Sequence, residues 1–235
     1  MINIENQLGK WYPVLRQEFS KPYMVEIGKR LSSVTELCPS PENIFKAYEL
    51  TPPDDVKVCI LGLDPYINGE AHGLCFSCET GKVPPSLRIM FTELVDCGLS
   101  TERRVDANLT DWARQGVFLL NTVLTTVRKQ TLAHGAWGWQ NFTGLTLKYL
   151  AESPQPIVFL IWGKDAMNSA HKYIVPYKTA NKEVLYACHP AAQTYGRTKF
   201  VENRHFTAAN DFLLLHGLKP IQWHNLQSPS QMTEQ

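Results

Sequence analysis

The sequence predicts an α/β fold with a central four-stranded, mostly parallel β-sheet flanked by helices on both faces. Two observations predict it. Four short runs are almost continuously apolar, which is typical of strands buried on both faces of a parallel sheet. Helix-length segments separate the runs, as crossover connections require. The four runs cover residues 56–61, 117–120, 157–161 and 184–187.

Four helices are predicted in the remaining segments. One begins at Pro41 with Ser40 as its N-cap and reaches Tyr48. Residues 86–97, 139–149 and 206–213 have apolar side chains at helical spacing. Gly217 and Pro220 end the last of these helices.

Length and composition favour a folded chain that lacks a membrane helix. The 235 residues are 44% hydrophobic and 11% aromatic, which excludes disorder as the main state. We expect one catalytic domain over residues 1–225 and a polar C-terminal tail over 226–235. No apolar run approaches the ~18 residues of a membrane span, and the N-terminus does not resemble a signal or transit peptide. These features predict a soluble protein of the cytoplasm, in a bacterium or a phage-infected cell.

Charge and cysteine content exclude few functions. Lysine plus arginine is 23 and aspartate plus glutamate is 22, a net charge of +1 that neither indicates nor excludes binding to DNA.

The six cysteines are too sparse for a disulfide scaffold. Cys75 and Cys78 have the spacing of a redox or metal pair. No second pair or zinc-like histidine pair follows, so we expect buried structural thiols.

Polar residues follow all four predicted strands, at the edge of the sheet where α/β proteins bind ligands. They are Asp64, Asn121, the pair Gly163 and Lys164, and His189. Each of them alone is ordinary: an aspartate before proline or an asparagine often only makes a turn. Together they provide an anion, an amide and a group that titrates near neutrality. The absence of a second acid at a strand end argues against paired-carboxylate glycoside hydrolysis.

A long ordered set of motifs resembles family 1 uracil-DNA glycosylases. Gly62-Leu-Asp-Pro-Tyr66 with Ala71-His-Gly-Leu-Cys-Phe-Ser77 is similar to the family's water-activating signature. Further similar segments follow in the family's order over roughly residues 10–225, and such a series is far more specific than any one motif. They include 83–87, 115–125, 138–139, 158–163, 189–190 and 203–206.

The resemblance implies hydrolysis of the N-glycosidic bond of a uracil flipped out of DNA, without a cofactor or a metal. It implies that Asp64 and His189 are catalytic. Asp64 is expected to stabilise the sugar cation and orient water, and His189 to donate to uracil O2. The uracil-binding residues are expected to be Leu63 through its backbone N–H, Tyr66 against a thymine methyl group, Phe76 by stacking, and Asn121 by pairing with the base edge.

DNA contacts are expected mainly at phosphates. Pro84, Pro85 and Ser86 resemble a backbone-compressing loop, and Gly163 with Lys164 takes the place of the family's Gly-Ser loop. The family's His-Pro-Ser-Pro-Leu-Ser becomes His189-Pro-Ala191-Ala-Gln193-Thr194. Ala191 lacks a phosphate-binding hydroxyl, and Gln193 replaces the apolar residue that fills the emptied base stack.

These departures predict, relative to typical members of the family, weaker activity on duplex than on single-stranded uracil DNA, unless Tyr195 fills the stack instead. The expected partners are uracil-containing single- and double-stranded DNA and DNA-mimic inhibitor proteins, and the expected state is a monomer. One alternative is a DNA-binding replication scaffold with the same fold and reduced catalysis. Another is a flavodoxin-like nucleotide-binding protein, although no Gly-rich phosphate loop is present.

Overall fold

The computed structural model describes residues 4–79, 82–196 and 199–224. Its centre is a four-stranded sheet in the order β3-β2-β5-β6, in which every neighbouring pair is parallel. The predicted four-stranded α/β fold is therefore confirmed. The strands are β2 (Val58–Gly62), β3 (Val117–Asn121), β5 (Ile157–Trp162) and β6 (Lys182–Ala187).

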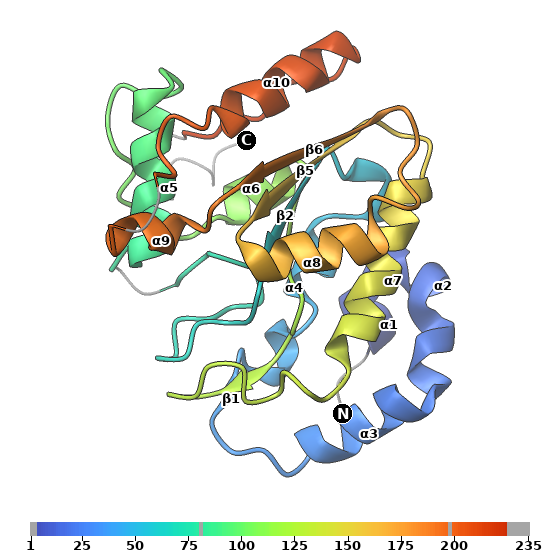
Figure 1. The fold of residues 1–235 in the computed structure, drawn as a ribbon. Helices are drawn as coiled ribbons and strands as arrows, with labels where there is room; N and C mark the ends of the chain where they lie inside the picture. The colour runs from blue at the N-terminus through green and yellow to red at the C-terminus, as the bar shows by residue number, and fades with distance from the viewer. Residues whose placement is uncertain (1–3, 80–81, 197–198, 225–235) are drawn as a thin grey trace, which may run out of the picture.

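Helices cover both faces of this sheet. Helices α8 and α10 pack on β5 from opposite sides (Figure 1). Strands β2, β3 and β5 are buried along their whole length, which explains their unbroken apolar sequences. The longer helices are α3 (Pro22–Leu31), α5 (Pro85–Asp96), α7 (Trp139–Glu152), α8 (Lys164–Tyr173) and α10 (His205–Leu215).

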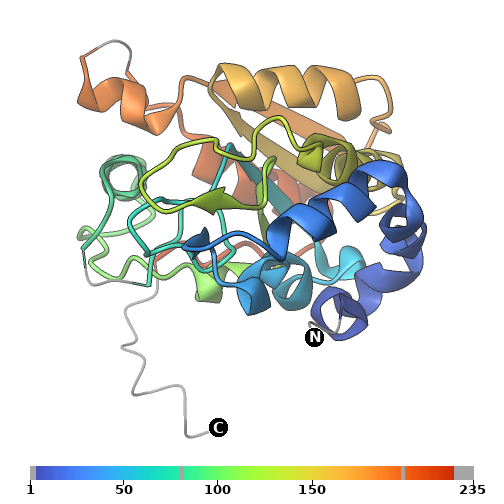
Figure 2. The same ribbon diagram turned by 90° about the horizontal axis from the view of Figure 1, so that it is seen from below.

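Several short elements lack a clear sequence signal. Leu37–Cys38 (β1) pairs with Thr126–Val127 (β4) in a separate antiparallel sheet. The helices at the N-terminus lie on the opposite side of the molecule from α9 (Figures 1 and 2). The short helices are α1 (Ile4–Leu8), α2 (Tyr12–Leu15), α4 (Lys46–Leu50), α6 (Thr110–Arg114) and α9 (Pro190–Thr194), with 3-10 turns at Gly9–Trp11, Arg16–Ser20, Pro41–Asn43 and Pro53–Asp55.

The predicted elements agree with the observed ones except at their ends. The first strand begins at Val58 rather than Val56, and the last begins at Lys182 rather than Val184. The helix predicted from Pro41 is divided into a 3-10 turn and α4. The predicted tail over 226–235 lies outside the described residues.

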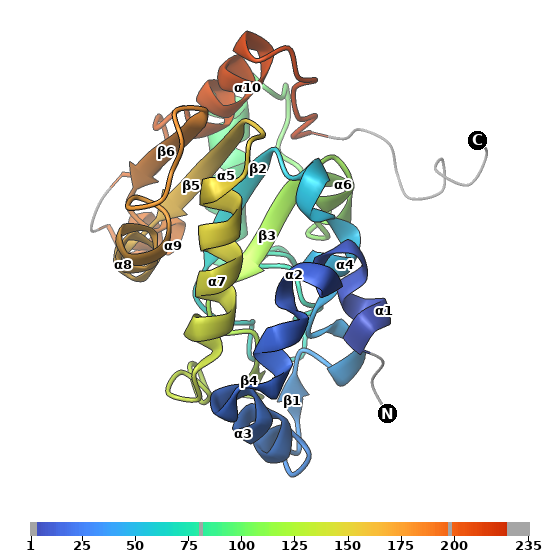
Figure 3. The ribbon, with the colours of Figure 1, turned by 90° about the vertical axis from the view of Figure 1, so that its right-hand side faces the viewer.

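The strand order places the ligand site. From β2 the chain crosses to β3 on one side, and the later strands β5 and β6 lie on the other side (Figure 3). Side chains beyond the carboxyl ends of the strands therefore surround a crevice at the point where the order reverses. No helix in the described ranges is long and apolar enough to cross a membrane.

Lys182 fixes the edge strand to the end of α7. Its ammonium group is buried, with 3% of the residue exposed, and donates to the carbonyl oxygens of Ser153 (2.7 Å) and Gln155 (2.6 Å). Lys182→Met should lower the free energy of unfolding by about 2 kcal/mol, because it leaves those carbonyls without a donor. Urea denaturation checks this, with the exposed Lys178→Met as the control; equal losses in the two variants would contradict the prediction.

Candidate active site

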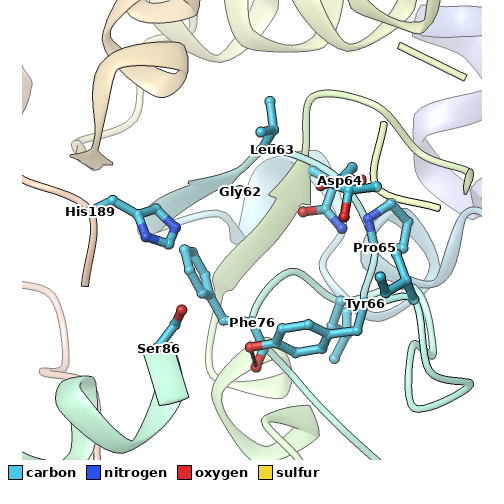
Figure 4. Close-up of a pocket in the computed structure, with 12 residues that line it drawn as sticks. Gly62, Leu63, Asp64, Pro65, Tyr66, Phe76, Ser86 and His189 are labelled. Carbon is cyan, nitrogen blue, oxygen red and sulfur yellow. Dashed lines mark hydrogen bonds between the residues drawn. The ribbon is translucent and has the colours of Figure 1, made fainter. Parts of the chain in front are cut away.

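A cavity of about 240 Å³ opens at the carboxyl ends of the central strands. Figure 4 shows Asp64 and His189 on opposite sides of it, with the ring of Phe76 between them. The structure therefore brings together all six of the residues that the sequence predicts as catalytic or uracil-binding. The cavity is lined by Gly62, Leu63, Asp64, Pro65, Tyr66, Ile67, Leu74, Phe76, Ser86, Asn121, Thr131 and His189.

Asp64 is half-buried directly beyond β2. Its Oδ2 atom accepts a hydrogen bond of 2.6 Å from the backbone N–H of Leu132. Burial raises the pKa of the Asp64 carboxyl, and the bond from Leu132 opposes this rise by favouring the ionised form. Among the described residues Oδ1 has no hydrogen-bond partner, so this oxygen is available to water or a ligand.

Leu132 presents its N–H from an unusual backbone conformation. Its φ is +55°, in the left-handed region that non-glycine residues seldom adopt. Such conformations persist where surrounding structure enforces them, often at functional sites. The conformation of this loop therefore directs the N–H of Leu132 toward Asp64. The two residues are 68 positions apart along the chain.

His189 is the N-cap of α9, and its ring is held by that helix. Its Nδ1 atom accepts a 3.1 Å hydrogen bond from the backbone N–H of Ala191. A ring nitrogen that accepts carries no proton, so the proton of the neutral ring is on Nε2. Burial lowers the pKa of His189, with Asp165 opposing the shift. The site therefore presents a neutral imidazole with an Nε2–H donor.

Asn121 ends β3 and lies directly opposite Gly62 in the pairing of β2 with β3. Its side chain packs so closely that a Cβ atom on Gly62 would come within 2.3 Å of Asn121 Oδ1. Only glycine at position 62 leaves room for the amide. Asn121 is 6% exposed, and its side-chain amide has no hydrogen-bond partner within the described ranges. It can therefore pair with a ligand that has both a donor and an acceptor.

Two aromatic side chains define the shape of the cavity. The hydroxyl of Tyr66 donates to the backbone carbonyl of Phe76 at 3.1 Å, which fixes the tyrosine ring. Phe76 has a φ of +61°, and its ring lies 5.7 Å from that of His189 and 6.0 Å from that of Trp162. Both rings are held in place before any ligand binds.

The residues predicted to contact DNA lie around the cavity rather than within it, except Ser86, which lines it. Pro84 caps α5 and Pro85 is its first residue. Gly163 packs under the histidine: a Cβ atom there would lie 2.9 Å from the Cβ of His189. Lys164 begins α8 and is exposed.

The remaining predicted DNA contacts belong to α9 or follow it. Ala191 contributes its backbone N–H to His189. The carboxamide oxygen of Gln193 accepts hydrogen bonds from the backbone N–H groups of Phe200 and Val201. Tyr195, directly after the helix, is 73% exposed.

The sequence did not indicate some residues that form the site. Thr131 and Leu132 belong to a loop without periodicity, far along the chain from Asp64, and no local pattern could place them there. In the sequence, Gly62 stands out only as part of a motif. Its direct pairing with Asn121 follows from strand register, which the sequence does not specify.

The paired cysteines near the cavity are buried. The thiol of Cys75 donates to the carbonyl oxygen of Ile60, and the thiol of Cys78 to that of Lys82. Burial raises the pKa of the Cys75 thiol well above its usual value, which disfavours the reactive thiolate. In the described part of the chain, no group of three or more His, Cys, Asp or Glu side chains could hold a metal ion.

The protonation of His189 can be measured directly. Nitrogen NMR of the ring at pH 7 should show an unprotonated Nδ1 and a protonated Nε2, because Nδ1 accepts from Ala191. On titration, the pKa of His189 should lie below 6.5, because burial disfavours the cation. A proton on Nδ1 at pH 7, or a pKa above 6.5, would contradict this description.

Comparisons with known proteins indicate one family for this chain. Residues 48–214 match the family model of the uracil DNA glycosylase superfamily. The uracil-DNA glycosylase of Idiomarina loihiensis is 39% identical over 91% of this chain and 99% of its own length. That of Azotobacter vinelandii is 40% identical over 94% of this chain and 95% of its own length.

A solved structure supports the same assignment. The crystal structure of mimivirus uracil-DNA glycosylase aligns with a TM-score of 0.84 and 27% identity, over 94% of this chain and 89% of that one. On the family model, the curated relatives and the fold together, this chain belongs to the uracil-DNA glycosylase superfamily.

Proposed function

We propose that the cavity binds uracil flipped out of DNA and that Asp64 and His189 catalyse hydrolysis of its N-glycosidic bond. The observation that carries this proposal is the pairing, across one cavity, of a half-buried carboxylate with a neutral imidazole. The membership of the superfamily makes the chain a uracil-DNA glycosylase; the roles of individual residues are the proposal.

Breaking this bond separates charge, and the two sides of the cavity match the two charges. The deoxyribose becomes cationic, and the Asp64 carboxylate stabilises it electrostatically. Oδ1, which is not engaged by Leu132, orients the water that attacks the sugar carbon. The water oxygen forms a bond to the sugar carbon as the bond to uracil N1 breaks; the water gives up one proton and the uracil anion takes up one, so the products are free uracil and an abasic site in DNA.

The uracil leaves as an anion with its charge largely on O2 and N1. The Nε2–H of His189 donates to O2 as this charge develops. Because this donor is fixed before the reaction, it costs little reorganisation, and such donors are typically worth about 10²–10³ in rate. A protonated ring would offer a stronger donor but would also repel the sugar cation.

Asn121 supplies selectivity for uracil. The edge of uracil has an acceptor at O4 and a donor at N3, which match the NH₂ group and the oxygen of one amide. Cytosine has the reverse pattern, and a mismatch of buried polar groups can give discrimination of about 10⁴–10⁵. The ring of Tyr66 excludes a thymine methyl group, Phe76 stacks on the base, and the backbone N–H of Leu63 is available to O2.

Residues around the cavity hold the DNA backbone in this proposal. Ser86 at the start of α5 and Gly163 with Lys164 at the start of α8 bind phosphates, with Pro84 and Pro85 shaping the first of these segments. Exposed Tyr195 remains the candidate for filling the emptied base stack. Ala191 contributes only backbone there.

The wider expectations also belong to this proposal. Residues 1–225 act as one catalytic unit, as a monomer in the cytoplasm of a bacterium or a phage-infected cell. A mimivirus UNG variant crystallised in complex with UGI aligns with a TM-score of 0.82 and 26% identity, which supports the expected binding of an inhibitor protein. The replication-scaffold alternative is not favoured, because a scaffold would not need this complete set of site residues.

The catalytic assignment predicts that Asp64→Asn loses about 10²–10⁴-fold in turnover while still binding DNA. The amide keeps the size of the side chain but removes the charge under the sugar. Release of free uracil from a single-stranded uracil oligonucleotide, with EDTA present, measures turnover, and fluorescence anisotropy measures binding. Wild-type turnover in Asp64→Asn would disprove its role.

The contact between Gly62 and Asn121 predicts a second variant effect. In Gly62→Ala the new methyl group would displace the Asn121 amide, and misplacement by about 1 Å can cost about 10²-fold in rate. Gly28→Ala is the matched control, because a Cβ atom there has no neighbour within 4 Å. Steady-state uracil release should fall only in Gly62→Ala. Equal rates in the two variants would count against the close packing.

A further inference from the structure

Two helices that begin at the cavity are linked through the segment 200–204. Helix α5 carries Ser86 in its first turn, and α9 has His189 as its N-cap. The two helices pack against each other (Figure 1). The segment 200–204 follows α9 along the chain and provides backbone N–H groups to a side chain on each helix.

Gln193, in the last turn of α9, holds the first part of this segment. Its Oε1 atom accepts from the N–H of Phe200 at 2.5 Å and of Val201 at 2.8 Å. Both donors belong to buried residues. Two bonds use both lone pairs of the carboxamide oxygen, so this atom is fully occupied within the protein.

Glu93, on α5, holds the second part. Its carboxylate is buried and accepts from the N–H of Glu202 at 2.5 Å and of Arg204 at 2.7 Å. Glu202 and Arg204 have φ values of +77° and +56°, a backbone conformation that is unfavourable for non-glycine residues. Their N–H groups converge on one carboxylate, which compensates for this conformation.

We infer that Gln193 is a positioning residue for His189. Gln193 and Glu93 together accept four hydrogen bonds, from the backbone N–H groups of residues 200, 201, 202 and 204, and we call these four bonds the clasp. The clasp fixes α9 against α5. The ring of His189 is bonded to the first turn of the five-residue helix whose last turn carries Gln193. A shift of α9 therefore moves the Nε2–H donor. This inference rests on the catalytic role proposed for His189.

The clasp gives Gln193 a different role from that of the apolar, stack-filling residue whose place it takes in the family's motif. A residue that fills the stack must project into DNA, whereas the carboxamide oxygen of Gln193 is directed to its own loop. The two roles predict opposite effects for two substitutions of similar size. Methionine is apolar and cannot replace the acceptor, and glutamate keeps an acceptor oxygen but adds a charge.

The experiment compares Gln193→Met and Gln193→Glu in the full chain. On saturating single-stranded uracil DNA, kcat should fall about tenfold in Gln193→Met and stay near wild type in Gln193→Glu, since a lost buried acceptor leaves both donors unsatisfied. The added charge of glutamate should raise KM rather than lower kcat. Hydrogen exchange at the amides of Phe200 and Val201 should be about tenfold faster only in Gln193→Met.

The stack-filling role predicts that uracil release from duplex DNA is faster in Gln193→Met and slower in Gln193→Glu, with unchanged hydrogen exchange in both. That result would overturn the inference, and so would faster exchange with an unchanged kcat. Gln17→Met, at an exposed glutamine in the N-terminal region, is the control for the substitution itself. The exchange rates do not depend on catalysis, so a wild-type protein that releases no uracil would refute the proposed function and not the clasp.

Discussion

The hydrogen bond from the backbone N–H of Ala191 determines which nitrogen of the neutral His189 ring carries the proton. By donating to Nδ1, this N–H places the proton of the neutral ring on Nε2, and burial of the ring disfavours a second proton. The cavity thus has negative charge on one side only, at Asp64, and a neutral donor on the other. In the mechanism that we propose, such a field favours separation of a sugar cation from a base anion, because each charge develops beside the group that stabilises it.

Close contacts between side chains and the backbone fix the other residues that line the cavity. Gly62 lets the Asn121 amide lie against β2, and Tyr66 is fixed by its bond to the Phe76 carbonyl. Left-handed conformations at Phe76 and Leu132 occur at the two places where the chain turns to meet the ligand site. The selectivity that we propose for Asn121 and Tyr66 therefore depends on rigid neighbours whose positions are set by strand register and turns.

Much of the fold was predictable because burial on both faces has a simple sequence signature. The apolar runs of β2, β3 and β5 and the periodic segments of α5, α7 and α10 were recognised for this reason. The short N-terminal helices and the β1–β4 pair were missed, since two-residue strands and single helical turns carry no periodicity. The start of β6 lies two residues before the predicted one because Lys182 and Glu183 are polar, and the buried ammonium of Lys182 depends on tertiary partners.

The residues of the site can likewise be separated into those that the sequence predicts and those that it does not. Asp64, Asn121 and His189 could be predicted because the carboxyl ends of parallel strands meet, and the motifs identified Tyr66 and Phe76. The N–H of Leu132 could not, because its contact with Asp64 depends on how a distant loop folds. The role of Gln193 could not be read from its motif either, since the motif aligns positions and does not show which way a side chain points.

A crystal structure of the complex with uracil tests the central claim most directly. We expect uracil O2 within about 3.2 Å of His189 Nε2, the Asn121 amide paired with N3 and O4, and uracil N1 facing Asp64. Nδ1 of His189 should remain bonded to Ala191. A uracil bound elsewhere, or one in this cavity with O2 turned away from His189, would contradict the account.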